Sequence, residues 1–256
     1  MKYTLALLAL IFLSFANANP PKQEYYEIRI YQLSNADQEK RMDAYLKDAF
    51  LPALHRAGIS KIGVFKPIGN DTAAVRKIYL LIPYKSINDV YAIDNKLEND
   101  KAYNSAGVDY INAAHDNPAY ARFSKIVLKA FSGHPVITKP KLNGPNNERV
   151  YELRSYEGAT EKLYKKKVDM FVKGNEIAIF DDLKFNPVFF AEVLAGTAMP
   201  NLMYMTSFEN KQLRDEHWKA FGDHPDWKKL EADVQYKNTV SHMDITFLNP
   251  VEYSDL

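Results

Sequence analysis

Two short segments of this sequence carry a glutamate, an arginine and a tyrosine at alternate positions. The first set is Glu27, Arg29 and Tyr31, and the second is Glu152, Arg154 and Tyr156. The guanidinium group offers a planar fork of donors that matches an oxyanion, and tyrosine combines an apolar ring with a polar tip. Each set is therefore suited to binding a carboxylate or a phenol and polarising it. The alternative interpretation is an ion pair that serves packing alone, because buried charges occur almost only in pairs.

A further acidic residue, Glu192, lies within the apolar run 188–194. A carboxylate among apolar side chains can have a raised pKa and act as a base. It can equally pair with a lysine at the edge of the sheet. We therefore add Glu192 to the six strand residues as a candidate ligand-binding residue, and we name no catalytic residue from the sequence.

The two sets belong to one repeated phrase. Tyr26–Tyr31 recurs as Tyr151–Tyr156, displaced by 125 residues, with four of the six positions identical. The same displacement carries Tyr79 onto Tyr204. A repeat of this length indicates a duplicated domain. We predict a first unit over 24–134, a linker rich in proline and asparagine over 135–147, and a second unit over 148–250.

Within each unit the pattern of apolar residues predicts the order βαββαβ, which is typical of ferredoxin-like units. The predicted strands cover 25–33, 61–68, 75–83 and 121–131, then 149–156, 186–196, 202–208 and 241–248. The predicted helical segments cover 37–57, 86–95 and 96–114, then 160–174, 176–183, 212–221 and 225–233. We expect a kink or a broken turn at Pro52, because proline removes a helix hydrogen bond.

The fold class predicted is therefore α+β, with two tandem units whose antiparallel sheets lie face to face. Alternation in the opening strands gives each sheet two different faces. The more apolar face, which we expect to contact the helices, consists of Tyr26, Ile28 and Ile30, with Tyr151, Leu153 and Ser155 in the second unit. The opposite faces carry the two Glu-Arg-Tyr sets, and we expect them to share a partly polar interior between the sheets.

The N-terminus resembles a secretory signal. Lys2 precedes the apolar stretch 5–15, and Ala16-Asn17-Ala18 matches a small-x-small cleavage site, so we predict a signal peptide over 1–18. The stretch is shorter than the roughly 20 residues that a membrane-spanning helix needs, although a retained anchor is the alternative. The expected location is outside the cytoplasm, as a periplasmic or secreted protein without a transmembrane segment.

Composition removes several classes of function. The chain has no cysteine, which excludes disulfides, thiol catalysis and zinc–thiolate sites. Lysine and arginine number 33 against 32 aspartates and glutamates, so nothing indicates the basic face that nucleic-acid binding needs. The run Lys165–Lys167 is interpreted as a solvated helix face. Neither a glycine-rich phosphate loop nor a Gly-x-Ser-x-Gly elbow is present.

Histidines and tryptophans give weaker signals. His217 and His224 lie seven residues apart, but Gly222 and Pro225 are expected to interrupt any helix that would align them on a metal. The single histidines that are candidates to ligate haem are His55, His115, His134 and His242. Trp218, Phe221 and Trp227 are interpreted as packing residues. We therefore predict no metal site and no cofactor.

The second unit is similar to NIPSNAP-family domains. The resemblance rests on Tyr151–Tyr156, on Pro187–Gly196 followed by Met199–Met205, and on the helical stretches Arg214–Phe221 and Asp223–Lys228. It covers about residues 148–248. The first unit keeps the opening phrase and the element order, but Trp218 has no evident counterpart there.

The resemblance implies a dimeric α/β-barrel fold, here with both units in one chain. That superfamily includes small monooxygenases, chlorite-dismutase-like haem proteins and enzymes that act on polyketides, and fold alone does not transfer function across it. The leading hypothesis is an exported protein that binds a small amphipathic molecule between its two sheets. The alternatives are a cofactor-independent monooxygenase or isomerase, and a haem-binding protein. Either a monomer or a homodimer is compatible with the sequence.

Overall fold

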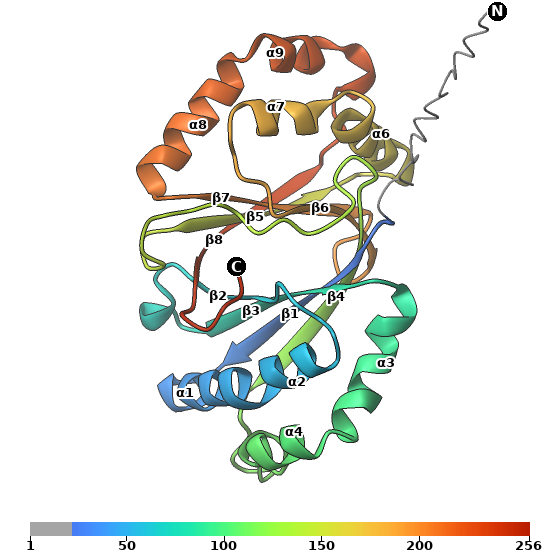
Figure 1. Ribbon diagram of the computed structural model, residues 1–256. Helices are drawn as coiled ribbons and strands as arrows, with labels where there is room; N and C mark the ends of the chain where they lie inside the picture. The colour runs from blue at the N-terminus through green and yellow to red at the C-terminus, as the bar shows by residue number, and fades with distance from the viewer. Residues whose placement is uncertain (1–21) are drawn as a thin grey trace, which may run out of the picture.

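Eight strands close into one barrel in the computed structural model, which describes residues 22–256 (Figure 1). Around the barrel the strands follow the order β1-β3-β2-β8-β5-β7-β6-β4, and every neighbouring pair is antiparallel. The predicted mixed fold of helices and an antiparallel sheet is confirmed. Within the described residues, no helix is both long and apolar enough to cross a membrane. The predicted signal peptide lies outside the described residues.

In the first half of the chain, strands and helices follow the predicted order. The elements are β1 (Tyr25–Leu33), α1 (Ala36–Tyr45), the π-helical turn η1 (Leu46–Phe50), α2 (Leu51–Arg56), β2 (Gly63–Pro67), the 3-10 turn η2 (Asn70–Thr72), β3 (Arg76–Tyr84), α3 (Ile87–Glu98), α4 (Lys101–Ala106), α5 (Val108–Ile111) and β4 (Arg122–Ala130). The helix continues through Pro52, which lies in the first turn of α2. The wider π turn directly before it marks the place where the regular hydrogen-bond ladder is interrupted.

The second half repeats the order. Its elements are β5 (Val150–Glu157), α6 (Glu161–Val172), α7 (Glu176–Asp182), β6 (Phe189–Ala195), β7 (Asn201–Phe208), α8 (Lys211–Asp223), α9 (Pro225–Ala232), the 3-10 turn η3 (Val234–Tyr236) and β8 (His242–Pro250). Between the halves, residues 135–147 contain neither helix nor strand. The strand order β8-β5-β7-β6 matches β4-β1-β3-β2 position by position. Descent of both halves from one duplicated unit stays a prediction.

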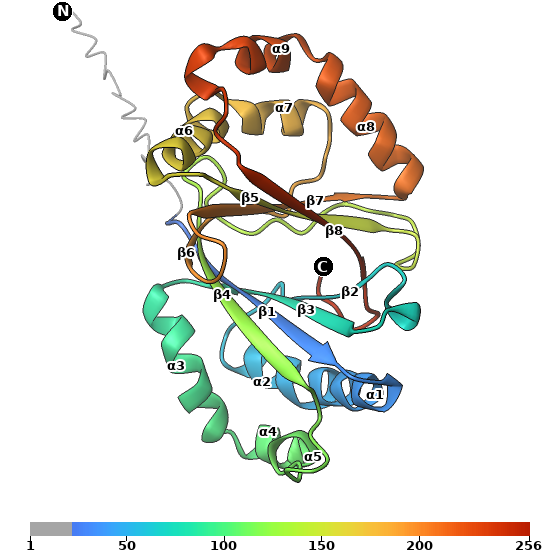
Figure 2. The ribbon, with the colours of Figure 1, turned by 180° about the vertical axis from the view of Figure 1, so that it is seen from behind.

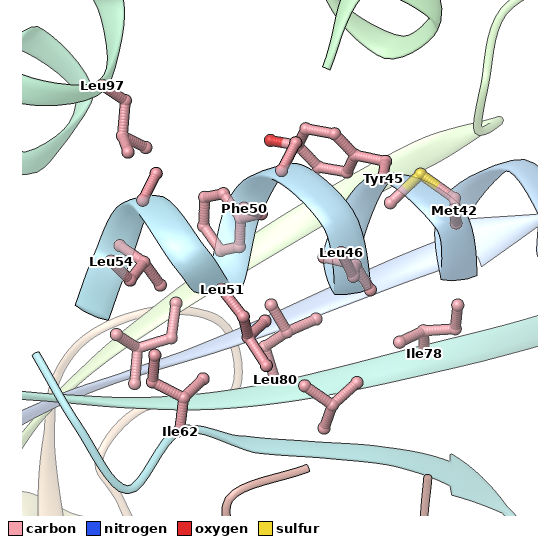
Figure 3. Close-up of a cluster of buried hydrophobic side chains, with 14 of the residues drawn as sticks. Met42, Tyr45, Leu46, Phe50, Leu51, Leu54, Ile62, Ile78, Leu80 and Leu97 are labelled. Carbon is pink, nitrogen blue, oxygen red and sulfur yellow. The ribbon is translucent and has the colours of Figure 1, made fainter. Parts of the chain in front are cut away.

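Helices cover the barrel on two opposite sides. The first-half helices lie below the strands and the second-half helices above them (Figures 1 and 2). Between the first-half helices and their strands, Met42, Leu46 and Leu54 belong to one buried cluster with Ile78 and Leu80 of β3 (Figure 3). A corresponding layer, rich in phenylalanine, separates the second sheet from α6–α9.

The barrel interior is apolar, and its composition corrects the predicted faces. Tyr26 of β1 contacts Phe189 of β6, and Phe65 of β2 contacts Tyr151 of β5, with ring centroids 5.4 and 4.8 Å apart. These residues belong to one buried cluster with Ile28 and residues of both halves. The face that we expected to contact the helices therefore fills the barrel, and the Glu-Arg-Tyr sets face the helices. The interior that closure seals takes the more apolar face, because it can offer no water to charged groups.

The strand register corrects one equivalence within the repeat. In the first half Arg29 lies opposite Leu80, whereas in the second half Arg154 lies opposite Tyr204. Tyr204 therefore corresponds to Leu80, one residue beyond Tyr79. Since side chains alternate along a strand, this single-residue difference places Tyr79 in the barrel and Tyr204 in the helix layer.

The apolar barrel yields a stability prediction. Phe65 is fully buried in the interior cluster, so Phe65→Ala should lower the free energy of unfolding by about 3–5 kcal/mol, through lost apolar contact and the cavity left behind. Tyr91 is 70% exposed, and Tyr91→Ala should change it by no more than about 0.5 kcal/mol. Urea denaturation of both variants tests this. Similar losses in the two would contradict a tightly packed barrel interior.

Candidate functional site

Each Glu-Arg-Tyr set forms one hydrogen-bonded strip on the helix-facing side of its sheet. In the N-terminal strip, Arg29 Nε donates to Glu27 Oε1 at 2.5 Å, and Arg29 Nη1 donates to the Tyr31 hydroxyl at 3.4 Å. In the C-terminal strip, formed by Glu152, Arg154 and Tyr156, the corresponding distances are 2.7 and 2.9 Å. The structure thus brings together the members of each set. The two strips contact different helix layers on opposite sides of the barrel.

Glu152 anchors the C-terminal strip to α8. Its carboxylate is fully buried and accepts hydrogen bonds from Arg154, from Arg214 at 2.7 and 2.8 Å, and from the indole N–H of Trp218 at 2.8 Å. Burial alone would raise the pKa of Glu152, but these donors and the two guanidinium charges bring it below its usual value. The Trp218 ring also covers the Arg154 guanidinium, with 3.7 Å from Cζ to the ring centroid. The arginine is consequently held in one orientation.

A second buried ion pair lies beside this strip. Lys167 of α6 donates to Glu176 of α7 at 2.8 Å, and both side chains are less than one-tenth exposed. Burial raises the pKa of Glu176, although Lys167 and Arg154 oppose that shift. The interpretation of Lys165–Lys167 as a solvated face is therefore wrong for Lys167. It points inward because the helix period places it on the same face as Tyr164 and Phe171.

Two tyrosine hydroxyls lie beside Arg154. The Tyr156 and Tyr204 hydroxyl oxygens are 2.8 Å apart, and Tyr156 also accepts from Arg154. Burial raises the pKa of Tyr204 well above its usual value, so its hydroxyl keeps its proton. If Tyr204 donates to Tyr156, the Tyr156 proton is directed to a further acceptor. This arrangement can present one hydroxyl donor next to a positively charged guanidinium.

These groups lie at a pocket of about 380 Å³ between the C-terminal sheet and its helices. The charged residues and tyrosines of the lining are buried and form what we call the polar floor, whereas both tryptophans are half-buried. The residues of this C-terminal pocket are Arg154, Tyr156, Lys167, Glu176, Tyr204, Trp218, Phe221, Gly222, Trp227, Val240 and Met243. The predicted site residues therefore contribute two members. Trp218, Phe221 and Trp227, which we interpreted as packing residues, also line it.

In the first half, the position next to Tyr31 that corresponds to this pocket contains aromatic side chains. By strand register, Phe123 lies opposite Tyr31 as Met243 lies opposite Tyr156. Tyr120 lies three residues before Phe123 in the first half, and Val240 lies three residues before Met243 in the second. The Tyr120 and Phe123 rings lie 5.3 and 5.5 Å from the ring of Tyr31. Smaller side chains at the two positions in the second half leave room for the C-terminal pocket.

The other predicted residues lie elsewhere. Glu192 faces the helix layer of the second half, where its carboxylate accepts from the Tyr164 hydroxyl at 3.0 Å, and it does not line the C-terminal pocket. His217 packs against Phe185 and Phe208, and His224 accepts the first backbone hydrogen bond of α9. No lining residue of the pocket is a histidine, so the pocket has no imidazole to ligate haem.

One histidine does gather carboxylates among the described residues. Glu157, His242 and Asp244 each place a ligand-type atom within 4.8 Å of the others. His242 and Asp244 are exposed, and the cluster lies outside the lining of the C-terminal pocket. His217 and His224, the pair that we considered for a metal, are not members of this group.

Sequence reasoning missed Lys167, Glu176 and Tyr204 as site residues. The signal that identifies Lys167 is its place in the apolar stripe of the predicted helix 160–174. For Tyr204, the 125-residue displacement indicated equivalence with Tyr79, and the one-residue register difference puts it on the other face of its strand. Glu176 begins a separate short helix, and only the tertiary fold brings it to Lys167.

Comparison with known proteins gives a family match for the second half of the chain and a fold for the whole. Residues 151–255 match the NIPSNAP family model. No curated protein matches the sequence. A solved candidate monooxygenase from Fusobacterium nucleatum subsp. nucleatum ATCC 25586 overlays with a TM-score of 0.60 at 9% identity, covering 90% of this chain and 94% of that chain. Another, from Lactobacillus acidophilus NCFM, has a TM-score of 0.59 at 13% identity, with the same coverage. These likenesses show the fold alone.

The Lys167–Glu176 pair yields a double-mutant prediction. Lys167→Met leaves Glu176 buried without its partner, so the free energy of unfolding should fall by about 3–5 kcal/mol. The 125-residue displacement carries Lys167 onto Met42 and Glu176 onto Leu51. In the double variant Lys167→Met/Glu176→Leu, the free energy of unfolding should therefore return to within about 1 kcal/mol of that of the parent protein. Denaturation curves measure both. Equal destabilisation by the single and double variants would show that the charges are not coupled.

Proposed function

We propose, from the premise that residues 151–255 form a NIPSNAP domain, that this half binds a small amphipathic molecule in the C-terminal pocket. The observation that carries the proposal is that the pocket combines a buried polar part with an aromatic part. Arg154, Tyr156 and Tyr204 are buried and supply the polar groups, and the half-buried rings of Trp218 and Trp227 supply aromatic surface. The C-terminal pocket takes the place of the binding site that we predicted between the two sheets, because packed apolar side chains fill the barrel interior.

Size and lining support a ligand of modest dimensions. A volume of about 380 Å³ falls at the lower end of the roughly 300–1,000 Å³ typical of small-molecule sites. Aromatic walls favour a flat apolar body, because rings stack or meet edge to face. The Tyr156 hydroxyl and the Arg154 guanidinium favour one oxygen-bearing head group at the floor. Action outside the cytoplasm remains part of the proposal and rests on the sequence of residues 1–18.

A second candidate function is proton removal from the bound molecule. Glu176 lines the pocket, and burial raises the pKa of its carboxyl, which makes the carboxylate a stronger base. Arg154 and Lys167 would stabilise the anion that forms. Such a step can begin an isomerisation, or an oxygenation in which molecular oxygen is the second substrate and no cofactor takes part. The fold likeness to candidate monooxygenases is compatible with this reaction class and does not select it.

Binding can be read from the protein itself, since both tryptophans of the chain line the pocket. We expect 2-naphthol or 2-naphthoate to change tryptophan emission saturably. The variant Val240→Tyr/Met243→Phe introduces larger rings into the pocket and should weaken binding at least tenfold while thermal unfolding stays cooperative. Ile245→Phe, on the same strand face but outside the lining, is the control. Equal affinity for all three proteins would place binding elsewhere, and no response to either compound would contradict the proposal.

The base hypothesis has its own measurement. If Glu176 removes the hydroxyl proton of bound 2-naphthol, the protein should accelerate deuterium exchange at carbon 1 of the ring, which proton NMR follows in deuterated water. Glu176→Gln preserves the shape of the side chain and should reduce exchange to the solvent rate, with affinity changed less than about threefold. Exchange that is equally fast in both proteins would remove Glu176 from this role and leave the binding proposal intact.

A further inference from the structure

In the first half of the chain, a tyrosine side chain from a neighbouring helix packs against the Glu-Arg-Tyr strip. The hydroxyl of Tyr110, from α5, lies 3.3 Å from the hydroxyl of Tyr31. The Tyr110 ring stacks on Tyr45 with centroids 3.6 Å apart and planes 6° from parallel. The Tyr110 ring also lies near the ring of Tyr120, with centroids 5.6 Å apart. A phenol is thus held by its hydroxyl on the strip and by aromatic rings around its body.

The two strips are equivalent by strand register. Arg29 and Arg154 each lie two residues after a buried glutamate and two before a tyrosine, and each contacts both. The space next to Tyr156 corresponds to the space next to Tyr31. In the first half Tyr110 and larger neighbours occupy that space, whereas in the second half the Tyr204 hydroxyl contacts Tyr156 and the remaining space belongs to the C-terminal pocket.

The buried cations of the C-terminal pocket already contact groups of the protein. Each nitrogen of the Arg154 guanidinium has a partner, since Nε and Nη2 contact Glu152 and Nη1 donates to the Tyr156 hydroxyl. Lys167 is paired with Glu176. A carboxylate ligand would have to displace one of these contacts to reach a cation, and transferring it from water into the pocket is costly. A neutral hydroxyl adds no charge to the buried site and can accept a hydrogen bond from the Tyr156 hydroxyl.

We propose that the ligand of the C-terminal pocket is a neutral hydroxyaromatic compound whose hydroxyl bonds to Tyr156 as that of Tyr110 bonds to Tyr31. The first half is then a self-occupied copy of the same site, with Tyr110 as its built-in ligand. This inference rests on the proposed function and narrows the head group, which the binding proposal leaves open between hydroxyl and carboxylate.

A three-compound series at pH 7 tests the head group with the shape held nearly constant. The probes are 2-naphthol, 2-naphthoate and naphthalene, titrated by tryptophan emission and by calorimetry. We expect 2-naphthol to bind about tenfold more tightly than either of the others, which is the size of a good hydrogen bond in a buried site. Equal or tighter binding of 2-naphthoate would overturn the hydroxyl assignment and leave the pocket as a binding site. Failure of all three to bind would overturn the proposed function itself.

A hydroxyl deletion identifies the partner atom. Tyr156→Phe should weaken 2-naphthol about fivefold to tenfold and leave naphthalene unchanged. The matched control is Tyr31→Phe, the same change on the N-terminal strip, which should affect neither compound. An equal loss for naphthalene would mean that Tyr156→Phe reshapes the pocket, and unchanged 2-naphthol affinity would overturn the role of the Tyr156 hydroxyl.

The self-occupied copy can be tested by vacating it. In Tyr110→Ala, added p-cresol should raise the melting temperature more than the same concentration of toluene does, because only p-cresol restores the hydroxyl contact with Tyr31. In the parent protein the two compounds should differ much less in their effect. Equal stabilisation of Tyr110→Ala by p-cresol and toluene would show that the N-terminal strip does not recognise a phenol hydroxyl, and would overturn the proposal.

Discussion

Closure of eight strands into one barrel is the constraint on which the rest of this structure depends. Because side chains alternate along each strand, every strand must give one face to a sealed interior and the other to the helices. Tyr26 and Tyr151 enter the interior, where apolar contacts from both halves meet. Arg29 and Arg154 are thereby directed toward the helices. Each helix layer consequently contains charged groups that need partners, and the candidate site arises in one of those layers.

Hydrogen bonding of buried charge decides the form of the C-terminal layer. Glu152 has no contact with solvent, so its carboxylate must be satisfied by donors within the protein. Arg154, Arg214 and Trp218 satisfy it and connect β5 to α8. A pocket floor built in this way is rigid, because movement of any one member would leave a buried charge unpaired. Such rigidity suits recognition of one head group in a fixed orientation.

The two halves show how side-chain volume distinguishes an occupied layer from an open one. Their strands share an order and a register around the strips, yet aromatic rings crowd Tyr31 whereas the C-terminal pocket lies beside Tyr156. The pairs Tyr120 with Phe123, and Val240 with Met243, account for part of that difference. None of these residues has a chemistry that marks it as functional in a sequence. Their importance lies in the space that they fill or leave free.

The sequence by itself determined the repeat, the order of strands and helices, and the grouping of each Glu-Arg-Tyr set on one strand face, because period-two alternation is a local property. The direction in which that face points was decided only by the tertiary structure. Alternation defines two faces without saying which one is enclosed, and our prediction chose the wrong one. Likewise, the approach of Glu176 to Lys167 and the one-residue register difference at Tyr204 depend on how separate elements pack, which no local pattern contains.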